Sequence, residues 1–402
     1  MKVKFTPSHA SGEICALPSK SFLHRTLICA SLADGESIIN NVVLSEDVKA
    51  TVNCLVSLGA KIDVVDNRAY VKGAGNNKRL LSSQLFCNES GSTLRFLVPV
   101  SLLLSEKSIF ICGNSLLKRP VFDFENIFNN KNVVFKTTDN GCFISGKLQN
   151  GKYLVSGDIS SQFVTGLLLS LPLVQGDSEI ILTSDLKSKP YIDITHSVCE
   201  QFGVSSVNND YKSFFIKGGQ HYTPCEITVE GDYSNAAYID AYNCFSGNVK
   251  VNGLSDSSLQ GDYKYKEYFD ILKSGNHLIN VSDCPDLAPV LTVVAAINHG
   301  CTLTGTSSLK YKESDRATAM KTELSKFGIQ VNVSDNSIEV LKSEIKTPEV
   351  SLESHNDHRV VMALSLLCSY YGGTINGFEA VNKSYPNYLD EIKKLGIKAE
   401  EE

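Results

Sequence analysis

The amino-acid sequence predicts an α/β protein of two domains, built from six repeats of a helix–strand unit with three repeats in each domain. Three observations support this prediction. The chain has 402 residues, which is too long for one hydrophobic core. Six segments share a polar start, an apolar stretch of helical length and a short alternating strand. A polar loop around residues 224–234 divides these segments evenly, which favours two groups of three over one closed ring.

The six repeats begin roughly 50 to 75 residues apart, longer than solenoid repeats, because each unit carries a second helix and a hairpin. Second helices are expected, for example, over residues 48–58, 192–202 and 317–327, each leading into a glycine. The first helices with their following strands are expected at residues 19–43, 92–112, 160–183, 234–252, 286–305 and 357–377.

Composition excludes several classes of protein. The formal net charge is −6 and no lysine–arginine stripe overrides it, which argues against a nucleic-acid partner. Residues 1–19 lack the apolar core of a secretory signal, and the longest apolar runs, 163–174 and 287–297, are too short to span a bilayer. Twelve cysteines occur without a Cys-x-x-Cys pair. They are interpreted as buried, reduced thiols of a cytoplasmic protein that has no membrane association.

The densest charge pattern is Lys312-Glu313-Ser314-Asp315-Arg316, which precedes apolar residues at helical spacing. Ser314 or Asp315 can cap the helix, whose free N–H groups favour anions. A solvated, salt-bridged helix start is the alternative interpretation for any such cluster taken alone. Several other helix starts in the chain carry the same kind of chemistry, which favours a binding site.

In the first half of the chain, three helix starts or loops combine cations with small polar residues. Ser21 and Arg25 lie four residues apart, on one helical face beside Lys20, which suits a phosphate or carboxylate. Gly91, between hydroxyl residues, offers backbone N–H groups at close approach to an anion. Arg119 adds a cation just before a proline. Each signal alone is weak, since exposed helix starts and Gly-Ser turns are common.

Hydroxyl and amide groups open the third repeat. Ser160, Ser161 and Gln162 can orient a polyol or a phosphate without adding charge, although simple helix capping explains them equally well. Further along, Ser188 can bond a ligand oxygen and Tyr191 can pack against a ring.

In the second half, Asp286 opens an apolar helix, Arg359 follows Asn-Asp-His at the sixth helix start, and Lys383 lies near the C-terminus. His355 and His358 have no third ligand at a zinc-site spacing, so no metal is expected. The cations together predict an anion-binding pocket on an acidic protein. In such a pocket, Asp286 and Glu313 are candidates for proton transfer.

These motifs, in this order and over essentially the whole chain, resemble the enolpyruvyl transferases, and among them the EPSP synthase family. The resemblance is carried by Pro18-Ser19-Lys20-Ser21 with Arg25, Gly91 before Arg95, Arg119-Pro120, Ser160-Ser161-Gln162, Ser188-Lys189-Pro190-Tyr191-Ile192-Asp193, Pro285-Asp286, Lys312-Glu313-Ser314-Asp315-Arg316 and Asn356-Asp357-His358-Arg359.

The resemblance implies an inverse α/β fold (EPT/RTPC-like), with helices inside and strands outside. It implies one domain of residues 1–18 plus 231–402, a second of residues 19–230, and an active site in the cleft between them. The implied reaction transfers the enolpyruvyl group of phosphoenolpyruvate to the 5-hydroxyl of shikimate 3-phosphate and releases phosphate, without a metal or an organic cofactor. Inhibition by glyphosate and a monomeric state are further expectations.

By likeness, Asp286, Glu313 and Lys20 are the implied catalytic residues. The residues implied to bind shikimate 3-phosphate are Lys20, Ser21, Arg25, Ser160, Ser161, Gln162, Ser188, Tyr191, Asp286 and Lys312. Those implied to bind phosphoenolpyruvate are Lys20, Gly91, Arg119, Gln162, Arg316, Arg359 and Lys383.

Three positions depart from the commonest family pattern, and one of them is Ser308, which occupies a place where some members use Asn to contact the shikimate. Glu89 stands where many relatives have Asn, so its charge must point away from the substrate or be paired. The family lysine near the C-terminus aligns with either Lys383 or Ser384.

Two other interpretations compete with this resemblance. One is the sister enzyme that uses UDP-N-acetylglucosamine, but that family has Lys-Asn where this chain has Lys20-Ser21, and a cysteine closer to Arg-Pro than Cys112 is to Arg119. The other is a non-catalytic anion-binding protein on the same fold, which would lack acid and base residues.

Overall fold

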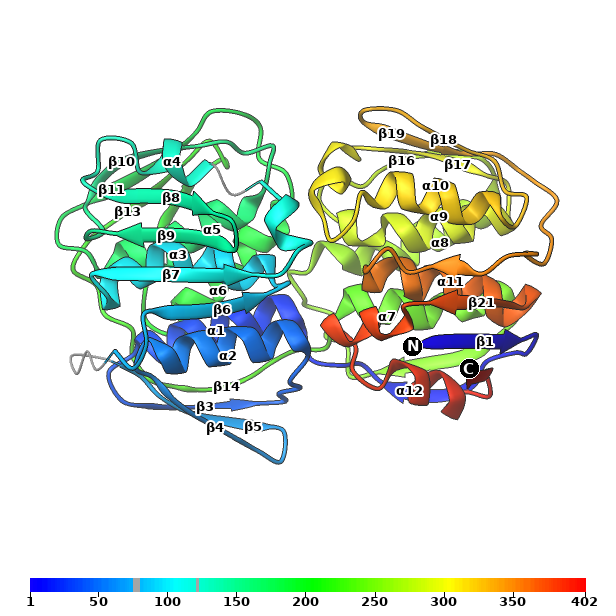
Figure 1. The fold of residues 1–402 in the computed structure, drawn as a ribbon, viewed down its shortest axis with the longest axis horizontal. Coiled ribbons are helices and arrows are strands. Elements are labelled where there is room, and N and C mark those ends of the chain that lie inside the picture. The colour runs from blue at the N-terminus through cyan, green and yellow to red at the C-terminus, as the bar shows by residue number, and fades with distance from the viewer. Residues whose placement is uncertain (75–79, 121–122) are drawn as a thin grey trace. The chain divides into compact units, whose positions relative to one another are not determined.

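The computed structural model describes residues 1–74, 80–120 and 123–402, and the chain divides into two compact units. Unit 1 consists of Met1–Leu17 and Gly231–Glu402, and unit 2 of Pro18–Glu230. Helices and strands alternate along both, as predicted for an α/β protein (Figure 1). Each unit has its own hydrophobic core.

The described part of unit 2 contains three four-stranded sheets with one shared pattern, in which a parallel strand pair is extended by an antiparallel hairpin. The sheet orders are β14-β3-β5-β4, β6-β7-β9-β8 and β10-β11-β13-β12. The strands are β3 (Glu36–Asn40), β4 (Lys61–Val65), β5 (Arg68–Lys72), β6 (Gln84–Asn88), β7 (Lys107–Cys112), β8 (Val134–Thr138), β9 (Gly141–Ser145), β10 (Gly151–Val155), β11 (Ser178–Leu182), β12 (Val207–Asn209), β13 (Ser213–Ile216) and β14 (Glu226–Thr228).

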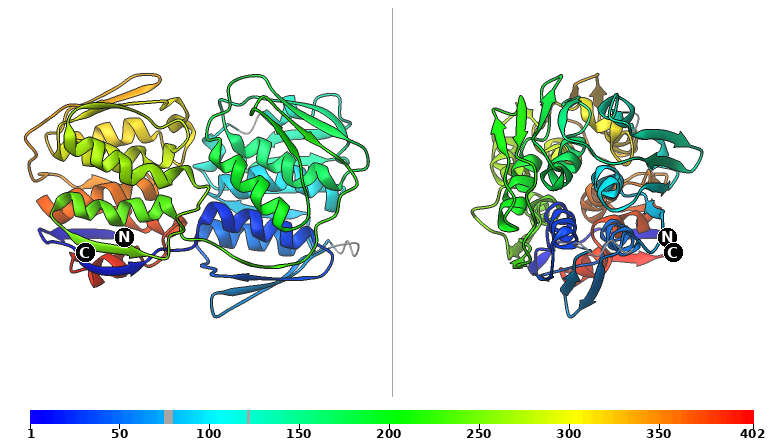
Figure 2. Two further views of the ribbon diagram at one scale, coloured as in Figure 1. Left: turned by 180° about the vertical axis from the view of Figure 1, so that it is seen from behind. Right: turned by 90° about the vertical axis from the view of Figure 1, so that its left-hand side faces the viewer.

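The helices of unit 2 lie inside these sheets (Figure 2). They are α1 (Lys20–Leu32), α2 (Glu46–Ser57), α3 (Gly91–Leu104), α4 (Asp123–Ile127), α5 (Ser161–Ser170) and α6 (Pro190–Gln201), with short 3-10 turns η1 (Leu116–Lys118) and η2 (Leu171–Leu173). Helices α3 and α5 are buried almost all round, because they carry apolar residues on every face. Helices α2 and α6 bury only one face.

Unit 1 repeats the arrangement in two sheets, with orders β16-β17-β19-β18 and β20-β21-β1-β22, whereas its third sheet, β15-β2, is a parallel pair of strands. Its strands are β1 (Lys2–Thr6), β2 (Ser11–Cys15), β15 (Asn248–Asn252), β16 (His277–Asn280), β17 (Cys301–Thr304), β18 (Val331–Val333), β19 (Ser337–Val340), β20 (Leu352–Glu353), β21 (Gly373–Asn376) and β22 (Lys398–Glu401). Its helices are α7 (Tyr233–Asp240), α8 (Tyr265–Ser274), α9 (Ala288–Ile297), α10 (Arg316–Ser325), α11 (His358–Tyr371) and α12 (Tyr388–Lys394). Its 3-10 turns are η3 (Ala241–Phe245), η4 (Gly261–Lys264), η5 (Pro285–Leu287), η6 (Ser307–Tyr311) and η7 (Phe378–Lys383).

All six predicted repeat helices occur, each followed by its strand. Three of them differ in detail. The helix predicted from Ser160 consists of α5 followed by η2, the predicted helix 234–245 consists of α7 followed by η3, and the helix predicted from Asp286 begins with η5 before α9.

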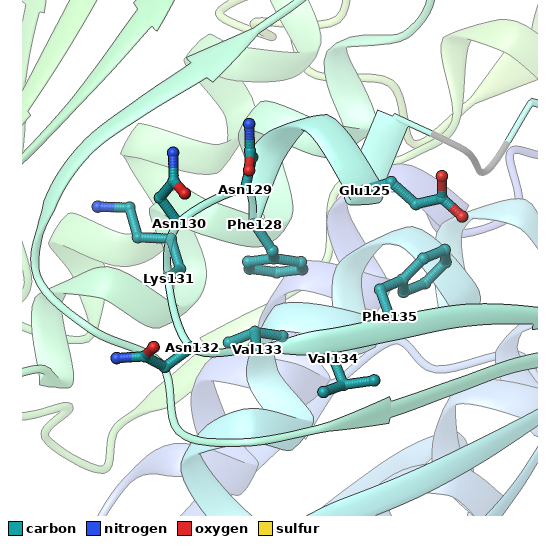
Figure 3. A pocket seen from close by; sticks show the side chains of 9 residues that line it. All are labelled: Glu125, Phe128, Asn129, Asn130, Lys131, Asn132, Val133, Val134 and Phe135. Atoms are coloured by element: carbon teal, nitrogen blue, oxygen red, sulfur yellow. The ribbon is translucent and has the colours of Figure 1, made fainter.

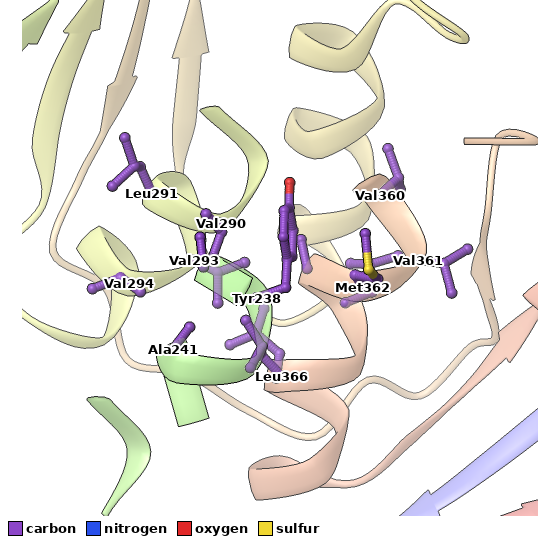
Figure 4. Close-up of a cluster of buried hydrophobic side chains, with 14 of the residues drawn as sticks. Tyr238, Ala241, Val290, Leu291, Val293, Val294, Val360, Val361, Met362 and Leu366 are labelled. Carbon is purple, nitrogen blue, oxygen red and sulfur yellow. The ribbon is translucent and has the colours of Figure 1, made fainter. Parts of the chain in front are cut away.

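The core of unit 1 gathers around Tyr238, a residue of α7. Its ring lies between side chains of α9, such as Val290 and Val293, and of α11, such as Met362 (Figure 4). These side chains are fully buried, and burying each contributes about 1.5 to 3 kcal/mol. The packing therefore fixes α9 and α11, and Asp286 and Arg359 lie at or just before the starts of these two helices.

Short polar side chains cap the repeat helices. Ser19 accepts from the backbone N–H of Phe22, and Ser90 accepts from that of Thr93. Ser160, Asp232, Asp315 and Asp357 cap the corresponding helices in the same way. Of the two residues proposed to cap the helix at Arg316, Asp315 is the cap.

No helix among the described residues has the length and apolar character needed to cross a membrane. All twelve cysteines are free thiols. The expectation that they are buried is wrong for Cys15, which is exposed, while Cys112, Cys225 and Cys244 are half-buried.

Replacing Gly166 with alanine tests the close packing of α3 on α5. A Cβ at Gly166 would stand 2.5 Å from the carbonyl oxygen of Arg95 and 2.8 Å from Cγ of Pro99. Alanine gains about 1 kcal/mol of helix propensity, but the contact with backbone forces the helices apart. We expect Gly166→Ala to lower the free energy of unfolding by about 1–3 kcal/mol in urea denaturation.

Gly275→Ala is the matched control, because φ at Gly275 is 161° and its Cβ would meet only His277 Nε2, at 3.4 Å. A Gly166→Ala variant as stable as the wild type would contradict this account of the helix contact.

Candidate active site

Arg316 is the centre of the candidate site in unit 1. Its guanidinium is 1% exposed and donates from Nη1 to Asp286 (2.7 Å), from Nη2 to Glu313 (2.7 Å) and from Nε to Asp357 (2.9 Å). Burial alone would lower the pKa of Arg316, but these carboxylates outweigh it and raise the pKa well above its ordinary value. Arg316 is therefore a permanent buried cation held by three anions.

Asp357 is fully buried and joins the starts of two helices. Its Oδ1 accepts from the backbone N–H of Arg359 at the N-terminus of α11, and its Oδ2 accepts from the hydroxyl of Ser314 as well as from Arg316 Nε. The carboxylate thus holds the start of α10 against the start of α11. Asp357 belongs to the Asn356–Arg359 motif, but no pattern in the sequence predicts this role.

Asp286 receives three cations. Lys312 Nζ donates to its Oδ1 at 3.2 Å, Arg316 Nη1 to the same oxygen, and Arg359 Nη2 approaches Oδ2 at 3.5 Å. Burial would raise the pKa of Asp286, but the charges of Lys312, Arg316 and Arg359 prevail and hold the pKa of this carboxyl well below its usual range. Without substrate, Asp286 is therefore an ionised carboxylate in a cationic cluster.

Arg359 is held by two residues of α7 that sequence analysis did not find. Asn235 Oδ1 accepts from Arg359 Nη1 at 3.0 Å, and the Arg359 guanidinium lies over the ring of Tyr238, 5.3 Å from its centroid. The Tyr238 hydroxyl donates to the carbonyl oxygen of Asp286 at 2.9 Å. The only sequence signal for Asn235 was its position just after a helix cap.

Lys383 and Ser384 both lie near the start of α11. Lys383 Nζ donates to the carbonyl oxygen of Asn356 at 2.5 Å, and the Ser384 hydroxyl approaches Asn235 Oδ1 at 3.4 Å. Of these two residues, Lys383 supplies the cation. Its ammonium group contacts Asn356, which lies three residues before Arg359 in the chain.

A further buried carboxyl lies behind Asp286. Asp262, in η4, accepts a hydrogen bond from the hydroxyl of Ser234 and is 2% exposed. Burial, reinforced by the charge of Asp286, raises the pKa of Asp262 to about 7, while the Ser234 hydrogen bond and Arg359 act in the opposite direction.

In unit 2, Arg25 is also engaged by the protein itself. It donates from Nε to Thr195 (2.7 Å), from Nη1 to the carbonyl oxygen of Ser21 (2.6 Å), and from Nη2 to the carbonyl oxygen of Tyr191 (3.0 Å) and to Thr165 (3.4 Å). The guanidinium is 2% exposed, and burial lowers its pKa to about 10. Arg25 therefore joins α1 to α5 and α6 and places Ser21 beside Tyr191.

Gly91 lies in a nest of cationic and amide groups. A Cβ at Gly91 would stand 2.9 Å from Arg95 Nη1, 3.1 Å from Arg119 Nη1 and 3.7 Å from Gln162 Oε1. Gln162 accepts from Arg95 Nη1 at 2.7 Å and donates to the Ser92 hydroxyl at 3.0 Å. Two guanidinium groups and the start of α3 thus converge where only a hydrogen side chain fits, which is suitable for an anion.

Lys20 is tied to the same region through Asp47, at 2.8 Å. Helix α1 is also joined to the Gly91 loop by a buried chain of hydrogen bonds from His24 through Thr51 and Thr93 to Ser90. Burial and the charges of Lys20 and Arg25 lower the pKa of His24 well below its ordinary value. His24 is thus a neutral packing residue. No sequence spacing indicated Asp47 or Thr51.

The remaining predicted serine residues lie at the starts of α5 and α6. Ser160 caps α5 by accepting from the N–H of Gln162, so the capping explanation is confirmed for this residue. Ser161 is the first residue of α5, and Ser188 lies just before α6 with φ of 59°. The structure brings Lys20, Gly91, Arg119 and Gln162 into one part of unit 2, and Asp286, Lys312, Glu313, Arg316, Arg359 and Lys383 into one part of unit 1.

Within the described ranges, no cluster of His, Cys, Asp and Glu is suited to a metal ion, and His355 bonds to Glu323 instead. One surface pocket of about 330 Å³ is lined by residues of α4, β8 and the loop between them (Figure 3). It contains none of the predicted site residues.

The family model described as EPSP synthase (3-phosphoshikimate 1-carboxyvinyltransferase) matches residues 5–392. The chain belongs to the EPSP synthase family. Curated relatives named 3-phosphoshikimate 1-carboxyvinyltransferase include one from Clostridium novyi, 38% identical and covering 98% of this chain and 97% of the relative. Another, from Clostridioides difficile, is also 38% identical and covers 99% of this chain and 98% of the relative.

A solved EPSP synthase from Acinetobacter baumannii has the same fold, with a TM-score of 0.79, 21% identity and 99% of each chain covered. The family and the fold class expected from the sequence motifs are thereby confirmed. Membership of the EPSP synthase family also accounts for a cationic site on an acidic chain, since the family name specifies a phosphorylated substrate.

The raised pKa of Asp262 predicts a pH-dependent stability. Between pH about 4 and 7 the unfolded chain releases this proton and the folded protein keeps it, so stability falls with rising pH by up to about 1.4 kcal/mol per unit. We expect Asp262→Asn to gain stability relative to the wild type across this window and to gain no more above it.

Urea unfolding of both proteins at pH 4.5, 5.5, 6.5 and 7.5 measures this difference. The lowered pKa of Asp286 affects stability only at more acidic pH, so it does not interfere. Parallel stability curves for the two proteins would show that Asp262 does not keep its proton.

Proposed function

We propose that this protein transfers the enolpyruvyl group of phosphoenolpyruvate to the 5-hydroxyl of shikimate 3-phosphate and releases inorganic phosphate. The observation that carries the proposal is the arrangement of Asp286, Glu313 and Arg316 in a chain of the EPSP synthase family. Two carboxylates on one buried guanidinium supply a base, an acid and positive charge within one cluster.

Phosphoenolpyruvate is bound, in this proposal, by cationic groups. Arg316, Arg359 and Lys383 each donate to carboxylate or carbonyl oxygens in the free protein. A substrate phosphate or carboxylate can replace part of these contacts without leaving a cation unpaired. The contributions from unit 2 are Lys20, Gly91, Arg119 and Gln162.

Shikimate 3-phosphate is bound mainly by hydroxyl groups. Ser161 and Ser188 are suited to the phosphate, and Ser21 and Tyr191, placed by Arg25, to the ring. Arg25 donates its hydrogen bonds to protein acceptors. We therefore assign it chiefly the role of holding Ser21 and Tyr191 in place. Lys20, Ser160, Gln162, Asp286 and Lys312 complete the proposed set.

The reaction requires a base at the hydroxyl and an acid at the vinyl carbon. Asp286 takes the proton of the 5-hydroxyl as its oxygen bonds to C2 of phosphoenolpyruvate, and Glu313 with Lys20 delivers a proton to C3. The tetrahedral intermediate then loses phosphate as the bond between C2 and the phosphate oxygen breaks, and the departing phosphate takes the proton held by Asp286. The proton at C3 returns to Glu313 with Lys20 as the double bond forms again. The low pKa of Asp286 in the free protein makes it a weak base, and it becomes stronger as its cations turn towards the substrate anions.

The phosphate leaving group carries the greatest charge, so positive charge stabilises its departure. No metal or organic cofactor has a role in this scheme. We also propose that the protein is a cytoplasmic monomer and that glyphosate inhibits it. Glyphosate combines a phosphonate with a carboxylate, so it carries the negative charges that the proposed phosphoenolpyruvate-binding cations attract.

Phosphate release from phosphoenolpyruvate, measured with shikimate 3-phosphate and separately with UDP-N-acetylglucosamine, tests the proposal. We expect release only with the shikimate ester, and a loss of about 10²–10⁴-fold in Asp286→Asn. Release only with the nucleotide sugar would indicate the sister activity. Binding of shikimate 3-phosphate without any release would indicate a non-catalytic protein.

Gly91→Ala tests the position of the phosphoenolpyruvate group. The added methyl must displace the guanidinium ends of Arg95 and Arg119. We expect KM for phosphoenolpyruvate and the inhibition constant of glyphosate each to rise about tenfold or more, equivalent to about 1.4 kcal/mol, with shikimate 3-phosphate binding retained. Unchanged glyphosate inhibition would place the inhibitor elsewhere, and Gly275→Ala is the control.

A further inference from the structure

Glu89 has an unexpected place beside the candidate phosphoenolpyruvate site. It lies two residues before Gly91, where an unpaired carboxylate would repel an anionic substrate. Its Oε2 accepts from the backbone N–H of Leu116 at 2.8 Å, and its Oε1 accepts from that of Ser115 at 3.2 Å. The negative charge is thus directed at backbone donors at the start of η1.

The turn that Glu89 holds ends at Arg119. The backbone N–H of Arg119 donates to the carbonyl oxygen of Leu116 at 3.0 Å, which closes η1. The side chain of Arg119 is 5% exposed, and its Nη1 lies 3.1 Å from the position of a Cβ on Gly91. One short segment, Glu89 to Gly91, therefore contacts both the backbone and the guanidinium end of the turn.

The chain after β6 and the chain after β7 are joined beside this carboxylate. Gly113 N–H donates to the carbonyl oxygen of Asn88 at 2.6 Å, which joins the end of β6 to the residue after β7. A Cβ at Gly113 would stand 2.3 Å from Oε1 of Glu89. Glycine thus leaves the space that the carboxylate occupies.

We infer that Glu89 is a positioning residue for phosphoenolpyruvate, which acts by fixing the turn that carries Arg119. This inference rests on the proposed function and adds to it a residue outside the substrate contacts. The two carboxylate oxygens receive two N–H groups on separate atoms. An amide has a single oxygen acceptor, so it would set an NH₂ group against one of the donors.

Glu89→Gln is nearly isosteric and tests the inference in the full-length protein. We expect KM for phosphoenolpyruvate and the inhibition constant of glyphosate to rise together by about tenfold, with kcat changed by less than about twofold. The dissociation constant of shikimate 3-phosphate, measured by calorimetry, should stay unchanged. The matched control is Glu125→Gln, which removes an exposed carboxylate from α4.

A double-mutant cycle separates positioning from a general structural effect. In an Arg119→Ala background, Glu89→Gln should have little further effect on phosphoenolpyruvate binding, because the residue that it positions is absent. The same fold-change in both backgrounds, or an unchanged KM in the single variant, would overturn the inference.

The outcome for the wild type distinguishes the two proposals. A wild-type protein that turns over phosphoenolpyruvate and a Glu89→Gln variant that matches it would refute only the role of Glu89. A wild-type protein that neither turns over phosphoenolpyruvate nor binds it in the presence of shikimate 3-phosphate would refute the proposed function and this inference with it.

Discussion

The buried guanidinium of Arg316 is the interaction on which the candidate site of unit 1 depends. A charge that is 1% exposed is stable only if it is paired, and Asp286, Glu313 and Asp357 pair it from three separate segments. The positions of these segments follow from the need to satisfy one planar cation. Lys312 and Arg359 then balance the remaining negative charge, so the cluster holds anions and cations in nearly equal number and can exchange some of its contacts for those of a substrate.

Hydrophobic packing reaches this cluster through Tyr238. The ring is fully buried in the core of unit 1 (Figure 4), while its hydroxyl bonds to the backbone of Asp286 and its face lies under Arg359. The packing of α7, α9 and α11 therefore sets the geometry of the charged groups. Asn235, on the same helix, adds a hydrogen bond to Arg359. A loss of core packing would accordingly appear as a loss of substrate affinity.

In unit 2, neutral groups hold cations as well as carboxylates do: Arg25 donates to hydroxyl and carbonyl oxygens, and Lys20 pairs with Asp47. Helix caps such as Ser90 and Ser160 satisfy some of the N–H groups at helix starts, and Gly91 leaves space where two guanidinium groups meet. The carboxylate of Glu89 is occupied by backbone donors. The positive character of the region thus results as much from where negative charge is placed as from the cations themselves.

The sequence by itself determined the α/β class, the repeat helices with their caps, and most candidate residues, because periodicity, capping chemistry and ordered motifs are local properties of the chain. It also required that the charge of Glu89 be paired or point away. Only the tertiary structure decided the partners. Asp47, Asn235 and the role of Asp357 escaped sequence analysis, and Arg25 proved to be engaged by α5 and α6, because these contacts join residues 27 to 170 positions apart. No local pattern encodes such distances, since they arise from the packing of whole helices.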